Sequence, residues 1–303
     1  MIRIGRLLAA FALTGCGTGA PAARPGDMAE PSHLSTRGTA DAEPARAPAA
    51  APAPLIRNPA DACPDAPLPA DAPSDAAALH ALGQKKIMAG DGAYAMAVLR
   101  KASEMTPGDP AVMGDLATAY LQCHRLREAV ATAEKAAAIA PADVALLSNL
   151  AQAYQMAGHV RLAIATLRKA VGIAPDDPAL HSDLAVLLAA MKELDEAEAE
   201  ARVAVRLDQT EVVSLVNLGS ILHRKGRDTD AEMILRRAVA AAPGNASAHN
   251  QLGLVLAAQG KNGQAALEFK TALTIDPNHP TARENLEAVS KGLDITGPWN
   301  KQP

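Results

Sequence analysis

Apolar residues recur along most of the chain at the spacing of one helical face, with a turn signal after each stretch. Leu147, Leu150 and Tyr154 follow the i, i+3, i+7 pattern that places side chains on one side of a helix. Gly158 comes next, at a point where a left-handed residue often ends a helix. A second apolar stripe follows, and Pro175 prevents that helix from continuing. The pattern predicts two helices joined by a short turn.

This helical hairpin recurs with a period of 34 residues. One leucine ladder and two alanine ladders keep the period without a break: Leu82, Leu116, Leu150, Leu184, Leu218 and Leu252; Ala95, Ala129, Ala163, Ala197, Ala231 and Ala265; Ala102, Ala136, Ala170, Ala204, Ala238 and Ala272. A single hairpin cannot bury its apolar face, whereas stacked hairpins can. We therefore predict repeats at 76–109, 110–143, 144–177, 178–211, 212–245 and 246–279, and a capping helix at 280–291.

The residues at these repeated positions resemble the tetratricopeptide-repeat (TPR) family. In the repeat at 144–177 they are Leu147, Leu150, Ala151, Tyr154, Ala163, Leu167, Ala170 and Pro175. The resemblance implies an all-α solenoid, a right-handed superhelix of about six helical hairpins with a C-terminal capping helix. The repeat at 178–211 departs most from the pattern, with His181, Lys192, Ala201 and Gln209, and we expect it to be the weakest unit.

The first residues, 1–15, have the layout of a secretory signal. Two arginines precede a short apolar run, and Leu13-Thr14-Gly15-Cys16 is similar to a bacterial lipobox. That resemblance implies cleavage before Cys16 and lipid attachment to it, which would anchor the chain to a membrane of the bacterial cell envelope. Gly17 is not the Asp that commonly marks inner-membrane retention, which favours the periplasmic face of the outer membrane. The alternative is an ordinary apolar N-terminus with a chance cysteine.

Two further segments flank the repeats. Residues 16–75 are rich in Ala and Pro, and proline at this density prevents helices and sheets from propagating. We predict a disordered linker there, which holds the folded part away from a membrane. Residues 292–303 are predicted to form an irregular tail, in which Trp299 either belongs to a loose end or folds back onto the solenoid.

Charge and motifs exclude several functions. The net charge of -4 gives no concentrated basic surface for nucleic acid. The sequence has no zinc-protease, phosphate-loop or serine-hydrolase motif, and its 8 histidines show no pair at metal-ligand spacing. We therefore expect no enzyme activity, no cofactor, no metal and no small-molecule substrate. Cys63 and Cys123 either form a disulfide, which an exported protein would favour, or remain independent thiols.

The TPR resemblance also implies that the first helices of successive repeats line a concave groove. The residues carried over to this groove are small, uncharged and partly apolar: His80, Gln84, Ile87, Thr118, Leu121, Ser148, Gln152, Gln155, Ser182, Val186, Val216, Ser220, His223, Asn250 and Leu254. We expect them to bind an extended or helical segment of a protein partner through shape and apolar contact. Binding at the convex face is the alternative.

A lipid-anchored TPR protein resembles the outer-membrane lipoproteins that assist pilus assembly, such as type IV pilotins and the lipoprotein of tight-adherence systems. This resemblance implies a scaffold function and a partner segment from a secretin, pilus or other envelope protein. The alternative function is an envelope adaptor that recruits peptidoglycan-remodelling enzymes. Both functions need the same kind of binding surface, so the fold alone does not distinguish them.

Overall fold

The computed structural model describes residues 63, 65, 67–70 and 72–292, a part of the chain that contains thirteen helices and no strand. The first helices of the six repeats are α1 (Ala76–Met88), α3 (Pro110–Gln122), α5 (Val144–Met156), α7 (Pro178–Ala190), α9 (Val212–Arg224) and α11 (Ala246–Ala258). The second helices are α2 (Gly92–Met105), α4 (Leu126–Ile139), α6 (Val160–Ile173), α8 (Leu194–Leu207), α10 (Asp228–Ala241) and α12 (Asn262–Ile275). A last helix, α13 (Ala282–Ser290), packs on α12. The predicted all-α solenoid is confirmed.

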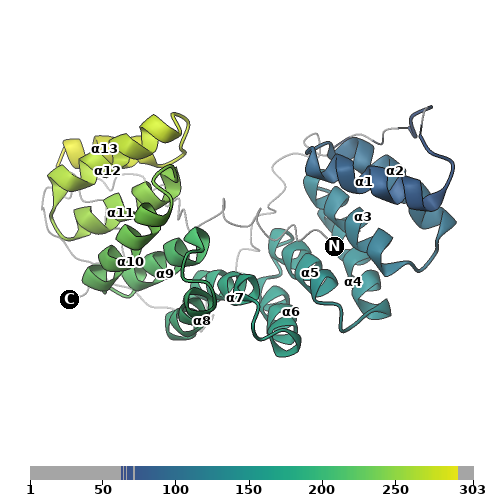
Figure 1. Cartoon of the computed structure of the whole chain (residues 1–303), viewed down its shortest axis with the longest axis horizontal. Helices are drawn as coiled ribbons and strands as arrows, with labels where there is room; N and C mark the ends of the chain where they lie inside the picture. The colour runs from purple at the N-terminus through teal and green to yellow at the C-terminus, as the bar shows by residue number, and fades with distance from the viewer. Residues whose placement is uncertain (1–62, 64, 66, 71, 293–303) are drawn as a thin grey trace, which may run out of the picture.

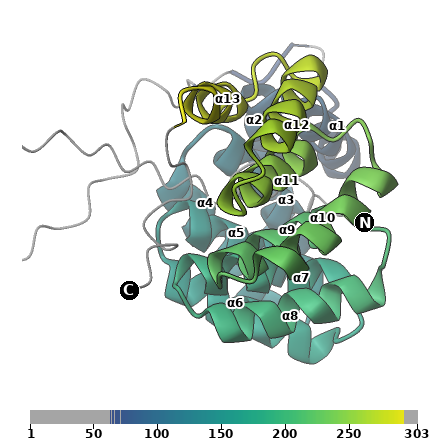
Figure 2. The ribbon, with the colours of Figure 1, turned by 90° about the vertical axis from the view of Figure 1, so that its left-hand side faces the viewer.

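The helices form an arch whose two ends, α1–α2 and α12–α13, lie on the same side of the molecule, opposite α6 and α8 (Figures 1 and 2). First helices of consecutive repeats contact each other directly, as α1 does with α3 and α7 does with α9. Among the described helices, the second helices have no comparable contacts with one another. In a curved array the more closely spaced row lies on the inner side, so the first helices line the inner face of the arch.

Each first helix begins at a polar residue whose side chain accepts a hydrogen bond from a free backbone N–H of the first turn. These capping residues also keep the 34-residue period: Asp75, Asp109, Asp143, Asp177, Glu211 and Asn245. The turns inside the hairpins need a left-handed residue, and four of the six use glycine. His124 and Lys192 take that conformation in the other two, with φ of 53° and 66°. A side chain is strained there, so these two turns are less favourable than the glycine turns.

Small residues allow the helices to pack closely. Every alanine in the two predicted alanine ladders is fully buried. Glycines in three first helices, α1, α9 and α11, leave space that a large residue of the second helix fills. A Cβ at Gly219 would lie 2.5 Å from Leu235 Cγ, and one at Gly253 would lie 2.6 Å from Phe269 Cε1. Close packing within each hairpin, together with apolar area buried between neighbouring hairpins, stabilises the solenoid.

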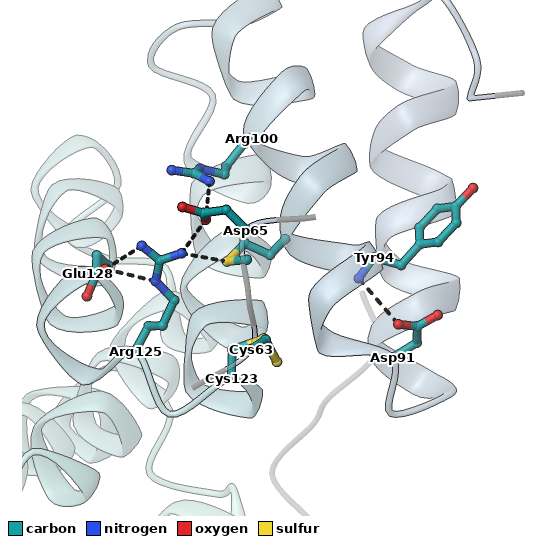
Figure 3. Close-up of a disulfide and its surroundings, with 9 residues drawn as sticks. Cys63, Asp65, Asp91, Tyr94, Arg100, Cys123, Arg125 and Glu128 are labelled. Atoms are coloured by element: carbon teal, nitrogen blue, oxygen red, sulfur yellow. Dashed lines mark hydrogen bonds and ion pairs between the residues drawn. A yellow bond between two sulfur atoms is a disulfide. The ribbon is translucent and has the colours of Figure 1, made fainter. Parts of the chain in front are cut away.

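A disulfide fixes the segment before α1 to the end of α3. Cys63 and Cys123 are bonded, with their Cα atoms 4.9 Å apart. Beside the bond, Asp65 Oδ1 accepts hydrogen bonds from Arg100 at 2.7 Å and from Arg125 at 2.5 Å (Figure 3). The bond from Arg125 lowers the pKa of Asp65. Of the two alternatives for the cysteines, the structure has the disulfide, and it ties this segment across repeats 1 and 2.

Several predictions concern other parts of the chain. The signal sequence, Cys16, most of the linker and Trp299 lie outside the described residues.

The last helix begins at Ala282 and not at 280, because Pro280 and Thr281 form a turn. The backbone N–H of Ala282 instead donates to His279 Nδ1 at 3.3 Å. Within the described residues, no helix combines the length and the apolar character needed to cross a bilayer.

Candidate functional site

The inner face contains the residues predicted to line a groove, but it buries about half of them. Ile87, Thr118, Leu121, Ser182, Val216, Ser220, His223 and Asn250 are buried between neighbouring helices. The side chains that remain accessible are His80, Gln84, Ser148, Gln152, Gln155, Val186 and Leu254. The expected continuous lining is therefore corrected to a smaller surface. Four of these accessible residues belong to α5 and α7, the first helices of repeats 3 and 4.

Polar side chains connect consecutive first helices across the inner face. At each connection a residue of one repeat meets the residue 35 positions further along the chain. His80 Nε2 lies 2.7 Å from Asp115 Oδ2. Farther along, Asn217 Nδ2 donates to Ser182 Oγ at 3.0 Å, and Asn285 Nδ2 donates to Asn250 Oδ1 at 3.0 Å. These hydrogen bonds help to fix the register at the three junctions where they form.

The sequence analysis did not name one partner in each of these bonds as a site residue. It comes from the ladder Ala81, Asp115, Asn149, Asp183, Asn217, Gln251 and Asn285, which keeps the 34-residue period. Every rung after the first is an acid or an amide, on helices that are otherwise mostly apolar. That polar ladder is the signal that could have identified these residues. We call it the inner polar ladder.

In the described part of the chain, three pairs of consecutive first helices lack such a bond: α3 and α5, α5 and α7, and α9 and α11. Among the described helices, α5 and α7 are the one pair of consecutive first helices in the six repeats that does not pack together like the others. Ser148 Oγ donates to Val144 O of its own helix, at 2.9 Å, and not to a residue of α7. Asp183, the ladder residue of α7, has no hydrogen-bond or ion-pair partner in the described part of the chain. We call the contact between these repeats the open junction.

The charge of Asp183 is destabilised in this position. Burial raises its pKa most, and together with the nearby carboxylates of Asp177 and Glu211 it brings the pKa to about 7. Both of those carboxylates act as caps, since Asp177 accepts from the Ala179 N–H and Glu211 accepts from the Ser214 N–H. A carboxyl group with this pKa is part ionised near neutral pH. It would gain from a positively charged hydrogen-bond donor.

The next junction along the chain, between repeats 4 and 5, is held by charges on its outer side. Glu198 of α8 accepts hydrogen bonds from Lys225 and Arg227 at 2.6 Å and from Arg202 at 2.9 Å. Burial raises the pKa of Glu198, but the bonds from Lys225 and Arg202 outweigh it and lower the pKa to about 2. We call this contact the closed junction. At the open junction the corresponding outer contact is one exposed ion pair, Arg168–Glu196.

Two histidines at packing positions of the solenoid have structural partners. His181 Nδ1 lies 2.6 Å from Glu200 Oε2, and His249 Nδ1 lies 2.6 Å from Glu268 Oε2. Each ring also contacts a proline carbonyl through its other nitrogen. In the part of the chain that the structure describes, no three His, Cys, Asp or Glu residues are grouped as metal ligands would be. A recess of about 440 Å³ lies between α4, α5 and α6, lined by apolar residues such as Leu147 and Leu162.

Comparison with known proteins defines the class. Tetratricopeptide-repeat family models match residues 86–153, 156–218, 212–245 and 230–280. The chain therefore belongs to the tetratricopeptide-repeat family. Solenoids of this kind present extended concave surfaces for binding. No curated protein matches the chain.

Solved structures share the fold at low identity. The chain is 19% identical to a chain of the APC/C hetero-tetramer Cut9-Hcn1, with a TM-score of 0.62, covering 71% of this chain and 43% of that one. It is 17% identical to pilF of Pseudomonas aeruginosa, with a TM-score of 0.60, covering 70% of this chain and 96% of pilF. YrrB, a TPR protein described as having an unusual peptide-binding site, is 20% identical with a TM-score of 0.49, covering 64% and 98% of the two chains. At these identities the likeness concerns the fold alone.

Proposed function

We propose that this protein is a lipid-anchored scaffold of the bacterial cell envelope that binds another protein during assembly of a pilus or secretion complex. The repeats bind the partner on their inner face, and the lipid on Cys16 holds them at the periplasmic side of the outer membrane. The protein acts by binding, without catalysis or a cofactor. The lipobox-like sequence before Cys16 supports the anchor. The match in fold to nearly the whole length of pilF is compatible with the pilus role.

The observation that carries the proposal is the surface formed by α5 and α7. Ser148, Gln152, Gln155 and Val186 remain accessible there, on the inner side of the arch, whereas the equivalent residues of repeats 2 and 5 are buried. Amides and a hydroxyl beside an apolar side chain can bind the backbone and small side chains of an extended segment. This surface also lies in the middle of the solenoid, where a bound segment can contact repeats on both sides.

Crosslinking tests this surface directly. A photoreactive amino acid placed at Gln152 in the full chain should crosslink to a secretin or pilus subunit in cells that make both proteins. The same amino acid at Leu267, an exposed residue of α12, is the matched control and should not. If the Leu267 probe captured the partner and the Gln152 probe did not, the binding surface would be the convex one.

A pair of double variants separates binding from stability. Gln152→Arg with Val186→Arg places bulk and charge on the accessible inner face and should abolish co-purification of the partner. Met233→Arg with Leu267→Arg makes the same kind of change at exposed positions of second helices and should leave it intact. Thermal melting of both variants must match the parent. Recovery of peptidoglycan synthases or hydrolases with the parent chain would favour the envelope-adaptor function.

The anchor has its own test. Cys16→Ser should abolish the mass increase that lipid adds to the mature N-terminal peptide, and the chain should leave the membrane fraction. A Cys16→Ser chain that is processed and fractionated like the parent would contradict the proposed anchor without affecting the binding surface.

A further inference from the structure

We propose that the open junction selects its protein partner through a lysine or arginine side chain, which Asp183 receives between α5 and α7. The inference deepens the proposed function, because it assigns a chemistry to the partner segment bound on the same surface. It would make Asp183 the residue that determines specificity, whereas the amides around it would contact any extended segment.

The chain contains an internal comparison that shows what such a carboxylate needs. Asp115 occupies the rung of the inner polar ladder two repeats before Asp183. Its Oδ2 is bonded by two donors of the preceding repeat, His80 Nε2 at 2.7 Å and Gln84 Nε2 at 2.8 Å. These donors lie 35 and 31 residues before the acid. The carboxylate between repeats 1 and 2 is therefore satisfied from within the protein.

The same two positions before Asp183 are Ser148 and Gln152. Neither is bonded to Asp183, because α5 and α7 do not approach each other as α1 and α3 do. Serine is also shorter than histidine and cannot replace its reach. Asp183 therefore lies at the same ladder position as Asp115, but no described side chain of the preceding repeat donates a hydrogen bond to it. A donor for it comes either from solvent or from a bound molecule, and a bound molecule can supply a charged one.

Charge decides which donor fits. Asp177 and Glu211 add negative potential at Asp183, and in the described part of the chain no Lys or Arg makes a hydrogen bond or ion pair with it. A neutral donor would leave that repulsion in place, whereas an ammonium or guanidinium group compensates it and supplies several N–H donors. The burial that disfavours the lone carboxylate strengthens such a pair once it forms. An extended segment with one basic residue therefore fits the open junction.

Peptide libraries test the inference without knowledge of the partner. The probes are four pools of nine-residue peptides, randomised except for a central Lys, Arg, Gln or Glu, applied to the purified mature chain. We expect retention of the Lys and Arg pools at least about tenfold above the Gln and Glu pools. With Asp183→Asn this preference should disappear. With Asp115→Asn it should persist, because that carboxylate is already bonded within the protein.

Two outcomes would overturn the inference: equal retention of the four pools by the parent chain, or an unchanged preference in Asp183→Asn. If residues on the outer face selected the basic pools, the preference would be unchanged in Asp183→Asn. The crosslink from Gln152 separates this result from the proposed function. A captured pilus or secretin segment without a basic residue near the crosslink would leave the scaffold function standing and remove Asp183 from it. Retention of the basic pools without any crosslinked envelope protein would support the role of Asp183 and contradict the proposed scaffold function.

Discussion

The open and closed junctions share a sequence pattern and differ in structure. Each places a serine on one first helix and an acid or amide 35 residues later on the next, Ser148 with Asp183 and Ser182 with Asn217. At the closed junction Asn217 donates to Ser182, and both side chains are buried. At the open junction no such bond forms and α5 and α7 do not pack together like the other first helices.

The difference shows how a repeat protein can build a binding site without adding a domain. An amide can donate to a serine hydroxyl, whereas an ionised carboxylate can only accept and needs the hydroxyl to donate to it. At the open junction the Ser148 hydroxyl donates to Val144 O of its own helix, so the charge of Asp183 has no donor among the described residues of the preceding repeat. Stability in a solenoid comes from contacts between neighbours, so one weakened junction leaves the remaining ones intact. The following predictions test this account by converting one junction toward the other.

The largest expected effect is that of Asn217→Asp, which gives the closed junction the chemistry of the open one. The variant buries a carboxylate at a site that is 6% exposed and removes the donor to Ser182. We expect a loss of about 2 to 4 kcal/mol in unfolding free energy near pH 8. Near pH 4 the protonated acid can donate again, so the loss should shrink. Urea unfolding at both pH values measures it. An equal loss at both would contradict the charge-based explanation.

Glu198→Gln removes the charge that holds the closed junction on its outer side. Glu198 is largely buried and bonded by three cationic side chains, so we expect a loss of about 2 kcal/mol at neutral pH. Its pKa is lowered to about 2, so the folded state favours the ionised form. The stabilisation is therefore present above the ordinary pKa of glutamate and is lost as the pH falls from about 4.5 toward 2.

The matched control is Glu196→Gln at the open junction. Arg168 Nη2 donates to both carboxylate oxygens of Glu196, at 2.7 and 2.9 Å, but both side chains are exposed. Exposed pairs contribute little, so the change should be below about 0.5 kcal/mol. Hydrogen exchange should show faster exchange in α8 and α9 for Glu198→Gln and no change in α6 and α8 for Glu196→Gln. Similar losses for the two variants would mean that the open junction is held as firmly as the closed one.

The period of 34 residues was sufficient to predict the hairpins, the buried alanine ladders and the solenoid, because each unit repeats the same local packing. It was not sufficient to predict which residues of the inner face are accessible. Ser148 and Ser182 are the same residue at the same rung, yet the first is partly open and the second is buried. The distance between α5 and α7 makes that difference, and it depends on contacts between repeats that a per-repeat pattern does not describe. The inner polar ladder was visible in the sequence but stood outside the family positions that were carried over.

Asp183→Asn converts the open junction toward the closed one and should stabilise the protein. The folded-state pKa of Asp183 is raised to about 7 from the ordinary value of 3.8. The folded state therefore binds the proton more tightly, and stability is lost as the pH rises from about 4 to about 7. Asparagine removes this loss, so we expect a gain of about 1 kcal/mol near pH 8 and almost none near pH 4. Thermal melting at the two pH values measures the gain. A variant less stable than the parent near pH 8 would show that Asp183 already has a favourable partner.

The smallest expected effect is the difference in unfolding free energy between alanine substitutions at Ser182 and at Ser148. Ser182→Ala removes the acceptor of a buried Asn217 N–H and should cost about 0.5 to 1 kcal/mol. Ser148→Ala removes a hydroxyl that bonds the carbonyl of its own helix, and alanine has the higher helix propensity, so the change should be within about 0.3 kcal/mol of zero. Chemical denaturation of both variants gives the difference. If Asp183→Asn closes the open junction, Ser148→Ala should become costly in that background, approaching the cost of Ser182→Ala. A cost that stays near zero in both backgrounds would show that the spacing of α5 and α7 is set by their apolar packing and not by the ladder residue.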